Sequence, residues 1–184
     1  MKRKQFGEVV RDDGPETHLK KAGTPTMGGV VIIGTIFVAM LFTANFASIP
    51  VLVTLGVTLS YFLLGFCDDY LKVLKKNTDG ISAKGKLLWQ FATALVAGYF
   101  LISKGVIDTN LYVPFVKGPL FDMGWFYVIF IGFVVVGSSN AVNLTDGLDG
   151  LAIVPTIMVA GAFALFAYVT GNVNFAEYLH LPHL

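Results

Sequence analysis

Charged side chains are scarce in this chain of 184 residues, where Asp, Glu, Lys and Arg make up 14%, against about 25% in a typical soluble domain. Too few polar groups are present to cover a water-facing surface, and too many apolar ones for a disordered chain. The single cysteine, Cys67, excludes a disulfide-stapled scaffold. A net charge of +1 excludes the strongly basic surface that a nucleic acid partner requires.

Apolar residues make up 55% of the chain, and they gather in five runs that contain no Lys, Arg, Asp or Glu. About 20 helical residues cross the bilayer core, so each run is close to the length of a span. The sequence therefore predicts an all-α polytopic membrane protein with about five transmembrane helices, in one integral membrane domain over residues 1–184. The expected spans are Met27–Phe46, Ile49–Phe66, Leu87–Ser103, Met123–Ser139 and Leu151–Thr170.

Basic residues set the expected orientation, because cytoplasmic loops carry most of the Lys and Arg of a membrane protein. Eleven of the 13 basic residues precede the first span or lie between the second and third. These segments are therefore expected on the cytoplasmic side. The expected cytoplasmic loops are 1–26, 67–86 and 140–150, and the expected external loops are 47–48, 104–122 and 171–184.

The external segment Asn110–Asp122 alternates loosely around Lys117-Gly118-Pro119, which is a turn signal, and predicts a short β-hairpin. A plain connector is the alternative. At the other end of the chain, the 26 residues that precede the first span are mostly polar, so no signal peptide is expected. Such a start is typical of an internal loop and predicts that the chain is a fragment.

Two adjacent carboxylates, Asp68 and Asp69, lie at the expected cytoplasmic end of the second span. A helix C-terminus carries partial negative charge, so acids placed there need cations, which Lys72, Lys75 and Lys76 can supply. Neighbouring residues point about 100° apart on a helix, so the two acids do not readily chelate one ion together. One is expected to face a metal or substrate while the other binds a lysine. A solvated helix end is the alternative.

Four polar side chains, Asn140, Asn143, Asp146 and Asp149, lie between the fourth and fifth spans. Residues three apart share a helix face, which joins Asn143 with Asp146 and Asp146 with Asp149. Amides and carboxylates beside glycines suit hydroxyls, a uracil edge or hydrated Mg²⁺. The alternative is helix capping, in which Thr145 or Asp146 caps the fifth span.

Lys21 and Thr26 lie just before the first span, where a helix N-terminus beside a lysine and hydroxyls can hold an anion. An ordinary helix start that contains Pro25 is the alternative. Together the three groups place carboxylates, lysines and amides at one face of the bilayer. That set suits transfer of a phosphorylated group to or from a lipid phosphate, and not ion conduction, where acids lie inside the spans.

Three motifs in this order resemble those of the phospho-N-acetylmuramoyl-pentapeptide transferases, within the polyprenyl-phosphate sugar-1-phosphate transferase superfamily. They are Arg11-Asp-Asp-Gly-Pro-Glu-Thr-His18 leading to Gly23-Thr-Pro-Thr-Met-Gly-Gly29, Asp68-Asp-Tyr-Leu-Lys-Val73 through Lys76, and Asn143-Leu-Thr-Asp-Gly-Leu-Asp-Gly-Leu-Ala152. The acidic motifs also occur in relatives that transfer N-acetylglucosamine 1-phosphate, whereas Thr24–Gly29 favours the muramoyl family. The resemblance covers residues from about 10 to 170.

The resemblance implies an integral enzyme of the bacterial cytoplasmic (inner) membrane, with its active site on the cytoplasmic face. Such an enzyme moves phospho-MurNAc-pentapeptide from UDP-MurNAc-pentapeptide to undecaprenyl phosphate, using Mg²⁺, and gives lipid I and UMP for peptidoglycan synthesis. The resemblance also implies that the enzyme is a homodimer embedded in membrane lipid. The family has about ten spans and another essential Asp in a later half, so the chain alone is expected to be inactive.

The resemblance also assigns roles by motif position. Asp68 would deprotonate or orient the polyprenyl phosphate, and Asp69 would support the metal. The substrate-binding residues would be Lys21, Thr26, Asn143, Asp146 and Asp149 on the nucleotide side, and Lys72 and Lys84 at the phosphates. A phosphate monoester is largely ionised at neutral pH, so a base is not strictly needed. A covalent aspartyl intermediate is the competing mechanism, and a sister transferase of N-acetylglucosamine 1-phosphate or a transporter is the competing function.

Overall fold

The computed structural model describes residues 28–75, 80–113, 115–116, 118–146 and 151–179, and these residues are mostly helical. They divide into two compact units, one up to Val136 and one from Gly137. The helical architecture with one small sheet confirms the all-α fold class.

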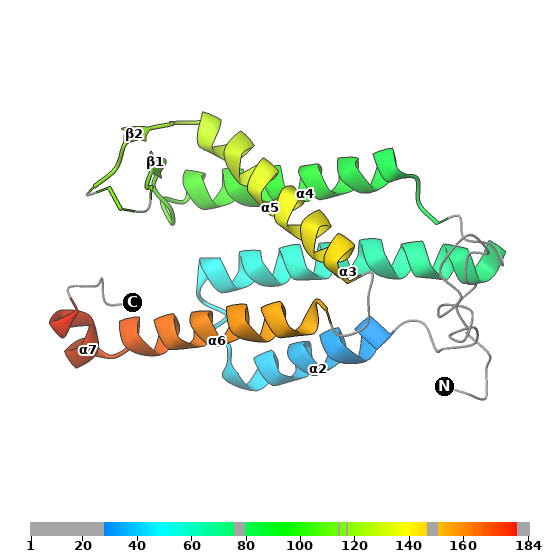
Figure 1. Ribbon diagram of the computed structural model, residues 1–184, viewed down its shortest axis with the longest axis horizontal. Helices are drawn as coiled ribbons and strands as arrows, with labels where there is room; N and C mark the ends of the chain where they lie inside the picture. Colours follow the sequence, from blue (N-terminus) through cyan, green and yellow to red (C-terminus); the bar gives the residue numbers. More distant parts are fainter. Residues whose placement is uncertain (1–27, 76–79, 114, 117, 147–150, 180–184) are drawn as a thin grey trace. The chain divides into compact units, whose positions relative to one another are not determined.

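Three helices run back and forth through the first unit (Figure 1): α2 (Gly28–Thr43), α3 (Ile49–Lys75) and α4 (Ala83–Ser103). Helix α2 has 16 residues and is shorter than the expected first span. It ends early because the Asn45 side chain accepts a hydrogen bond from the backbone N–H of Ala47 at 3.0 Å, which turns the chain toward α3.

Helices α3 and α4 both extend beyond the apolar runs that predicted them. Helix α3 continues nine residues past Phe66, and α4 begins at Ala83 rather than at Leu87. The Ser82 hydroxyl caps α4 by accepting the backbone N–H of Gly85 at 3.2 Å. Much of the expected loop 67–86 is therefore helical, which gives its side chains fixed directions.

Polar side chains join α3 to α4 inside their apolar length. The hydroxyls of Ser60 and Thr93 lie 2.8 Å apart, and the indole N–H of Trp89 donates to the Ser60 hydroxyl at 2.9 Å. The Tyr61 hydroxyl donates to the backbone carbonyl of Gln90 at 3.4 Å. Hydrogen bonds of this kind are a common means of association between helices in lipid, where water does not compete for the polar groups.

A two-stranded antiparallel sheet follows α4, with β1 (Asn110–Leu111) paired to β2 (Phe121–Asp122). This confirms the predicted hairpin over the plain connector. Gly118 has φ of +80°, a left-handed conformation that favours glycine in the turn. Hydrogen bonds from the Thr109 hydroxyl and the Gly124 backbone N–H lower the pKa of Asp122, so its carboxylate stabilises the base of the hairpin.

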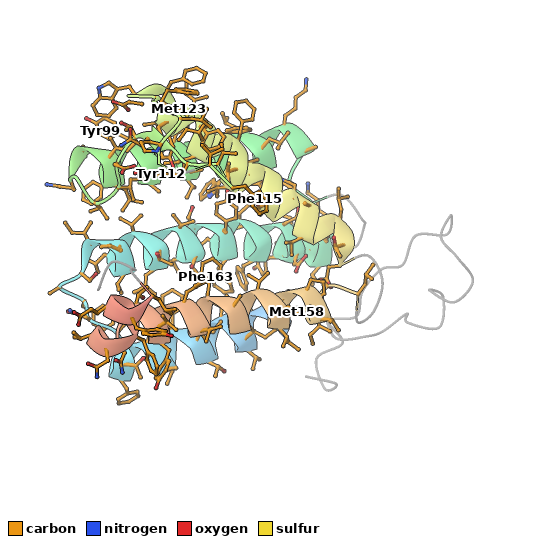
Figure 2. All side chains as sticks on the ribbon, turned by 60° about the vertical axis from the view of Figure 1, so that its left-hand side comes forward. Tyr99, Tyr112, Phe115, Met123, Met158 and Phe163 are labelled. Atoms are coloured by element: carbon orange, nitrogen blue, oxygen red, sulfur yellow. The ribbon has the colours of Figure 1, made fainter. Side chains whose placement is uncertain are left out.

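Helix α5 (Phe126–Thr145) starts in the first unit, where it packs closely on α4 through glycines. An added Cβ at Gly98 would lie 3.3 Å from Ile131 Cδ1, and one at Gly132 would lie 3.1 Å from Leu95 Cδ2. Nearer the hairpin, Tyr99 stacks on Trp125 at 5.5 Å between ring centroids. Figure 2 labels Tyr99 on α4.

The second unit contains the end of α5, then α6 (Ile153–Thr170) and α7 (Val173–Tyr178). Side chains such as Met158 and Phe163 extend outward from α6 (Figure 2), and none of the residues of α6 is buried. The Asn172 side chain caps α7 by accepting the backbone N–H of Asn174 at 3.0 Å. Helix α7 packs on the end of α6, with Tyr168 and Phe175 rings 5.9 Å apart.

Among the described residues, four helices are long and apolar enough to cross a membrane: α3, α4, α5 and α6. Helix α2 is also apolar, but it falls short of that length. This pattern is that of a multi-pass membrane protein, as the sequence predicts. The expected sidedness of the loops stays a prediction.

We predict that Gly98→Leu lowers the free energy of unfolding by about 1–3 kcal/mol, because the larger side chain overpacks the contact with Ile131. Thermal unfolding in detergent measures the effect. Gly34→Leu is the matched control, since a Cβ at Gly34 meets no atom within 4 Å. Equal stability of the two variants would show that the α4–α5 contact does not require a small residue.

Candidate functional site

Asp68 is buried where the C-terminal end of α3 meets the start of α4, with only 7% of its surface exposed. Its Oδ2 accepts hydrogen bonds from the ammonium groups of Lys72 at 2.8 Å and Lys86 at 2.7 Å. Its Oδ1 accepts the backbone N–H of Ile81 at 2.7 Å. We call Asp68, Lys72, Lys86 and the Ile81 amide the Asp68 cluster.

The Asp68 cluster keeps its carboxylate ionised. Asp68 lies two residues beyond the apolar run of α3. Burial by itself would raise the pKa of Asp68, but the hydrogen bonds from Lys72, Lys86 and the Ile81 amide outweigh burial and hold that pKa below its ordinary value. A buried carboxylate with both oxygens bonded is a poor proton acceptor, and it is well suited to hold two lysines in place.

Gly80 allows the backbone to approach Asp68 closely. An added Cβ at this residue would overlap Asp68 Oδ1 and lie 2.7 Å from its Cγ. Because there is no Cβ, the segment that leads into α4 can bring the Ile81 amide onto the carboxylate. The need for glycine here comes from this close approach.

Asp69 is half-buried, with its side chain 44% exposed, while its neighbour Asp68 is enclosed. Its Oδ1 lies 3.5 Å from the ammonium of Lys72. The two acids therefore have different surroundings, as their angular separation on a helix predicts. The structure thus confirms that one of them binds lysines and excludes a solvated helix end for Asp68, and Asp69 keeps accessible oxygens.

Lys86 is a site residue that sequence reasoning missed. It lies one turn into α4 and four residues before the buried Gln90, so both belong to the side that faces α3. The capping position of Ser82 and this four-residue spacing are the signals that could have found it. Lys84, which was expected at the phosphates, is exposed on the first turn of α4, and its role stays a prediction.

Asn143 and Asp146 lie at the end of α5 in the second unit, and both are exposed. The backbone N–H of Asp146 bonds the Val142 carbonyl at 3.0 Å, so helical geometry reaches this residue and keeps it on the face of Asn143. Capping does not account for the group: the Thr145 hydroxyl donates to Ala141 in its own helix. The N-cap position of α6 is Ala152, which has no side-chain cap bond.

Three expected substrate-binding residues lie outside the described residues: Lys21, Thr26 and Asp149. The structure therefore brings together Asp68, Asp69 and Lys72 from the predicted set and adds Lys86. Asn143 and Asp146 belong to the other unit.

Comparison with known families covers both acidic segments. The family model for glycosyl transferase family 4 matches residues 50–181, which include α3 from its second residue and all of α4 to α7. The chain belongs to glycosyl transferase family 4. Residues 21–33 also match the first signature of the phospho-N-acetylmuramoyl-pentapeptide transferases, which confirms the resemblance found in Gly23–Gly29. This family 4 member is a glycosyl-1-phosphate transferase of the muramoyl-pentapeptide transferase type.

A divalent metal fits the donors of this family 4 transferase only in part. Lys72, Lys86 and the Ile81 amide occupy both carboxylate oxygens of Asp68, so Asp69 supplies the accessible carboxylate on α3. No group of three or more acids, histidines or cysteines forms a metal centre among the described residues. Mg²⁺ commonly uses one or two carboxylates together with substrate phosphates and waters, so Asp69 suits a site that the substrate completes.

The transferase has two ammonium groups at the polar end of an apolar helix. Each ammonium carries three N–H donors, and the Asp68 carboxylate occupies part of this capacity in both. The remaining donors of Lys72 and Lys86 can bind phosphate oxygens, since both side chains are more than one-third exposed. The arrangement can therefore hold an anionic group at the membrane surface.

We predict that Gly80→Ala weakens the Asp68 cluster, because its methyl group displaces the Ile81 amide from the carboxylate. Loss of this buried hydrogen bond should cost about 1–3 kcal/mol of stability and lower the transfer rate of the complete enzyme. Thermal unfolding and a transferase assay measure the two effects. Gly65→Ala in α3 is the matched control, since its Cβ meets no atom within 4 Å. Gly80→Ala behaving like this control would contradict the close-approach role of Gly80.

Proposed function

We propose that this transferase, in its complete form, moves phospho-MurNAc-pentapeptide from UDP-MurNAc-pentapeptide to undecaprenyl phosphate and releases UMP. The bond formed joins an acceptor phosphate oxygen to the β-phosphorus of the donor, and the bond broken releases the uridine monophosphate oxygen. The product is lipid I, and the active site faces the cytoplasm of a bacterium. The match of residues 21–33 to the muramoyl signature supports the choice of sugar.

The Asp68 cluster is the observation that carries this proposal. Two lysines held 2.7 and 2.8 Å from one carboxylate lie at the end of a helix that is long and apolar enough to cross the membrane. A lipid phosphate has its charge at the same boundary. Lysine charges there offset the repulsion between an anionic acceptor and an anionic diphosphate, which is the main electrostatic demand of phosphoryl transfer.

Of the two roles considered for Asp68, its surroundings favour orientation over proton abstraction. Lys72, Lys86 and the Ile81 amide occupy both carboxylate oxygens. The acceptor phosphate is largely ionised without a base, so its oxygen can attack directly. A covalent aspartyl intermediate at Asp68 would require these bonds to break before the reaction. Asp68 therefore acts in this proposal by positioning the lysines.

In this proposal, Asp69 and the donor diphosphate would together hold a Mg²⁺ ion. When bound, it would stabilise the negative charge that develops on the departing nucleotide. Asn143 and Asp146, with Lys21, Thr26 and Asp149, remain the proposed nucleotide side. Lys84 is proposed at the phosphates, on the same first turn of α4 as Lys86.

We predict that Asp69→Asn and Lys86→Gln each lower the transfer rate of the complete enzyme by about a hundredfold. Lys86→Gln removes a positive charge that offsets the phosphates, and Asp69→Asn removes the carboxylate that would hold Mg²⁺ against the donor diphosphate. A radiolabelled donor and extraction of the lipid product measure the rate. Lys104→Gln is the control, since Lys104 lies at the opposite end of α4, over the Phe100 ring. Normal turnover in both site variants, with the protein folded, would contradict their proposed roles.

We also predict that UDP-MurNAc-pentapeptide is the preferred donor when it competes with UDP-N-acetylglucosamine at equal concentration. Mass spectrometry of the lipid products measures the preference, and EDTA should abolish product formation in a manner that added Mg²⁺ reverses. A clear preference for UDP-N-acetylglucosamine would assign the chain to the sister transferases. Flux of a solute across liposomes without any transfer would instead support a transporter.

A further inference from the structure

The hairpin between α4 and α5 is apolar, although it lies outside the helices. Between Asp108 and Asp122 the sequence contains one charged residue, Lys117. Turns that face water are usually rich in Gly, Asn, Asp and Ser. Seven of the 13 residues from 109 to 121 are instead aromatic or aliphatic: Leu111, Tyr112, Val113, Phe115, Val116, Leu120 and Phe121. This composition indicates contact with an apolar surface.

Most of these side chains are exposed together on the hairpin. We call five of them the hairpin patch: Val113, Phe115, Val116, Leu120 and Phe121. Phe115, which Figure 2 labels, is fully exposed, and Phe121 is 55% exposed. Contiguous apolar patches on a protein surface commonly mark contact with a membrane or with another protein. The hairpin patch is therefore an interaction surface.

The strand register separates polar from apolar side chains. Leu111 pairs with Phe121, and Asn110 pairs with Asp122. Paired residues of an antiparallel sheet point to the same face, and neighbours along a strand point to opposite faces. One face of the sheet is thus apolar, and the other, which carries Asn110 and Asp122, is polar. A sheet with two such faces can lie flat on a boundary between lipid and water.

Both acids of the hairpin have their hydrogen bonds at its base. Asp108 accepts the Tyr112 hydroxyl and the backbone N–H of Asn110, each at 3.2 Å. Asp122 accepts the hydroxyl of Thr109. The carboxylates are therefore held near the helix ends, and the described part of the tip carries no charge. A partner at the tip meets apolar side chains and not an ion pair.

Aromatic rings and a lysine mark the membrane boundary beside the hairpin. Helices α4 and α5, which the hairpin joins, are both long and apolar enough to cross a membrane. Tyr99 of α4 stacks on Trp125, and the Lys104 ammonium lies 5.6 Å from the Phe100 ring centroid. Trp and Tyr are enriched where lipid meets water, and lysines there extend toward the headgroups. Since α4 begins at the Asp68 cluster, the hairpin lies at the opposite membrane surface (Figure 1).

We propose that the hairpin lies flat in the lipid headgroup region of this surface, with the hairpin patch inserted among the upper acyl chains. The partner is the bilayer itself, because it is the nearest apolar phase: six residues separate the hairpin from α4, and three separate it from α5. Insertion removes exposed apolar area from water, which is favourable. It also fixes the depth of α4, whose other end carries Lys86. This inference does not depend on which sugar phosphate the enzyme transfers.

Fluorescence quenching on the complete enzyme in nanodiscs tests the position of the tip. Phe115→Cys carries the environment-sensitive fluorophore NBD, after Cys67 and every other native cysteine are replaced by alanine. We expect strong quenching by lipids with a doxyl group high on the acyl chain, weaker quenching by lipids labelled near the chain end, and the least by iodide in the water. The same label at Asn110→Cys, on the polar face of the sheet, is the matched control, and iodide should quench it more strongly.

A charged variant tests what holds the tip in lipid. Leu120→Asp/Phe121→Asp replaces two apolar side chains of the hairpin patch by carboxylates, which are costly to insert. It should raise iodide quenching of the Phe115→Cys label about tenfold. Leu120→Val/Phe121→Leu keeps the hairpin patch apolar and should leave the quenching unchanged. Thermal unfolding checks that both variants fold, and the quenching profile without these substitutions decides the proposal if the charged variant does not.

Four results would overturn the proposal. Strong iodide quenching of the Phe115→Cys label would show that the tip stands in water. Weak quenching by iodide and by both doxyl lipids would show that protein covers the tip, either a second copy or another chain. Equal quenching of the Phe115→Cys and Asn110→Cys labels would show that the two faces do not differ. Unchanged quenching in a folded Leu120→Asp/Phe121→Asp variant would show that apolar insertion does not hold the hairpin.

Discussion

The buried charge of Asp68 is the constraint on which the rest of the site depends. A carboxylate that is 7% exposed is tolerated only when cations and hydrogen bonds replace the water it has lost. Two lysines and one backbone amide meet this demand, and they come from both sides of the α3–α4 connection. The close approach of the backbone at Gly80 and the position of the Lys86 ammonium both serve this demand.

This arrangement also separates structural from chemical roles among neighbouring residues. Asp68 is committed to its lysines, while Asp69 keeps oxygens that a metal or substrate can reach. Lys72 contacts both acids and so connects the two environments. A substrate phosphate that binds Lys72 would therefore compete with interactions inside the protein. The strength of those interactions sets how much of the lysine charge is available to it.

The sequence alone predicts the helices of this protein well and their ends less well. Runs without charge mark where a segment is apolar, and they correctly place α3, α4, α5 and α6. Hydropathy changes at Phe66, but the helix continues to Lys75, because the Leu and Lys residues of this segment have high helix propensity in water. Turn residues around Gly118 correctly predict the hairpin, since local backbone preferences decide that structure.

Contacts between helices were harder to predict, because they depend on register. The sequence indicates that Asp68 needs cations, but residues 68 and 86 meet only through the geometry of the connection between them. The role of Gly80 appears only when a Cβ is placed against the carboxylate. The four-residue spacing of Phe62, Phe66 and Tyr70 is visible in the sequence, whereas the contacts between their rings require the fold.

The Ser60 hydroxyl contacts two α4 side chains, Thr93 and Trp89, about 12 Å along the helix from Asp68. These bonds fix the rotational angle of α3 about its own axis. A rotation by a single residue would exchange the two chemically identical acids, so that Asp69 became enclosed and Asp68 faced outward. The contacts that determine which of the two carboxylates is enclosed therefore lie within the apolar length of α3. A substitution at Ser60 would change which carboxylate is accessible without replacing any charged residue.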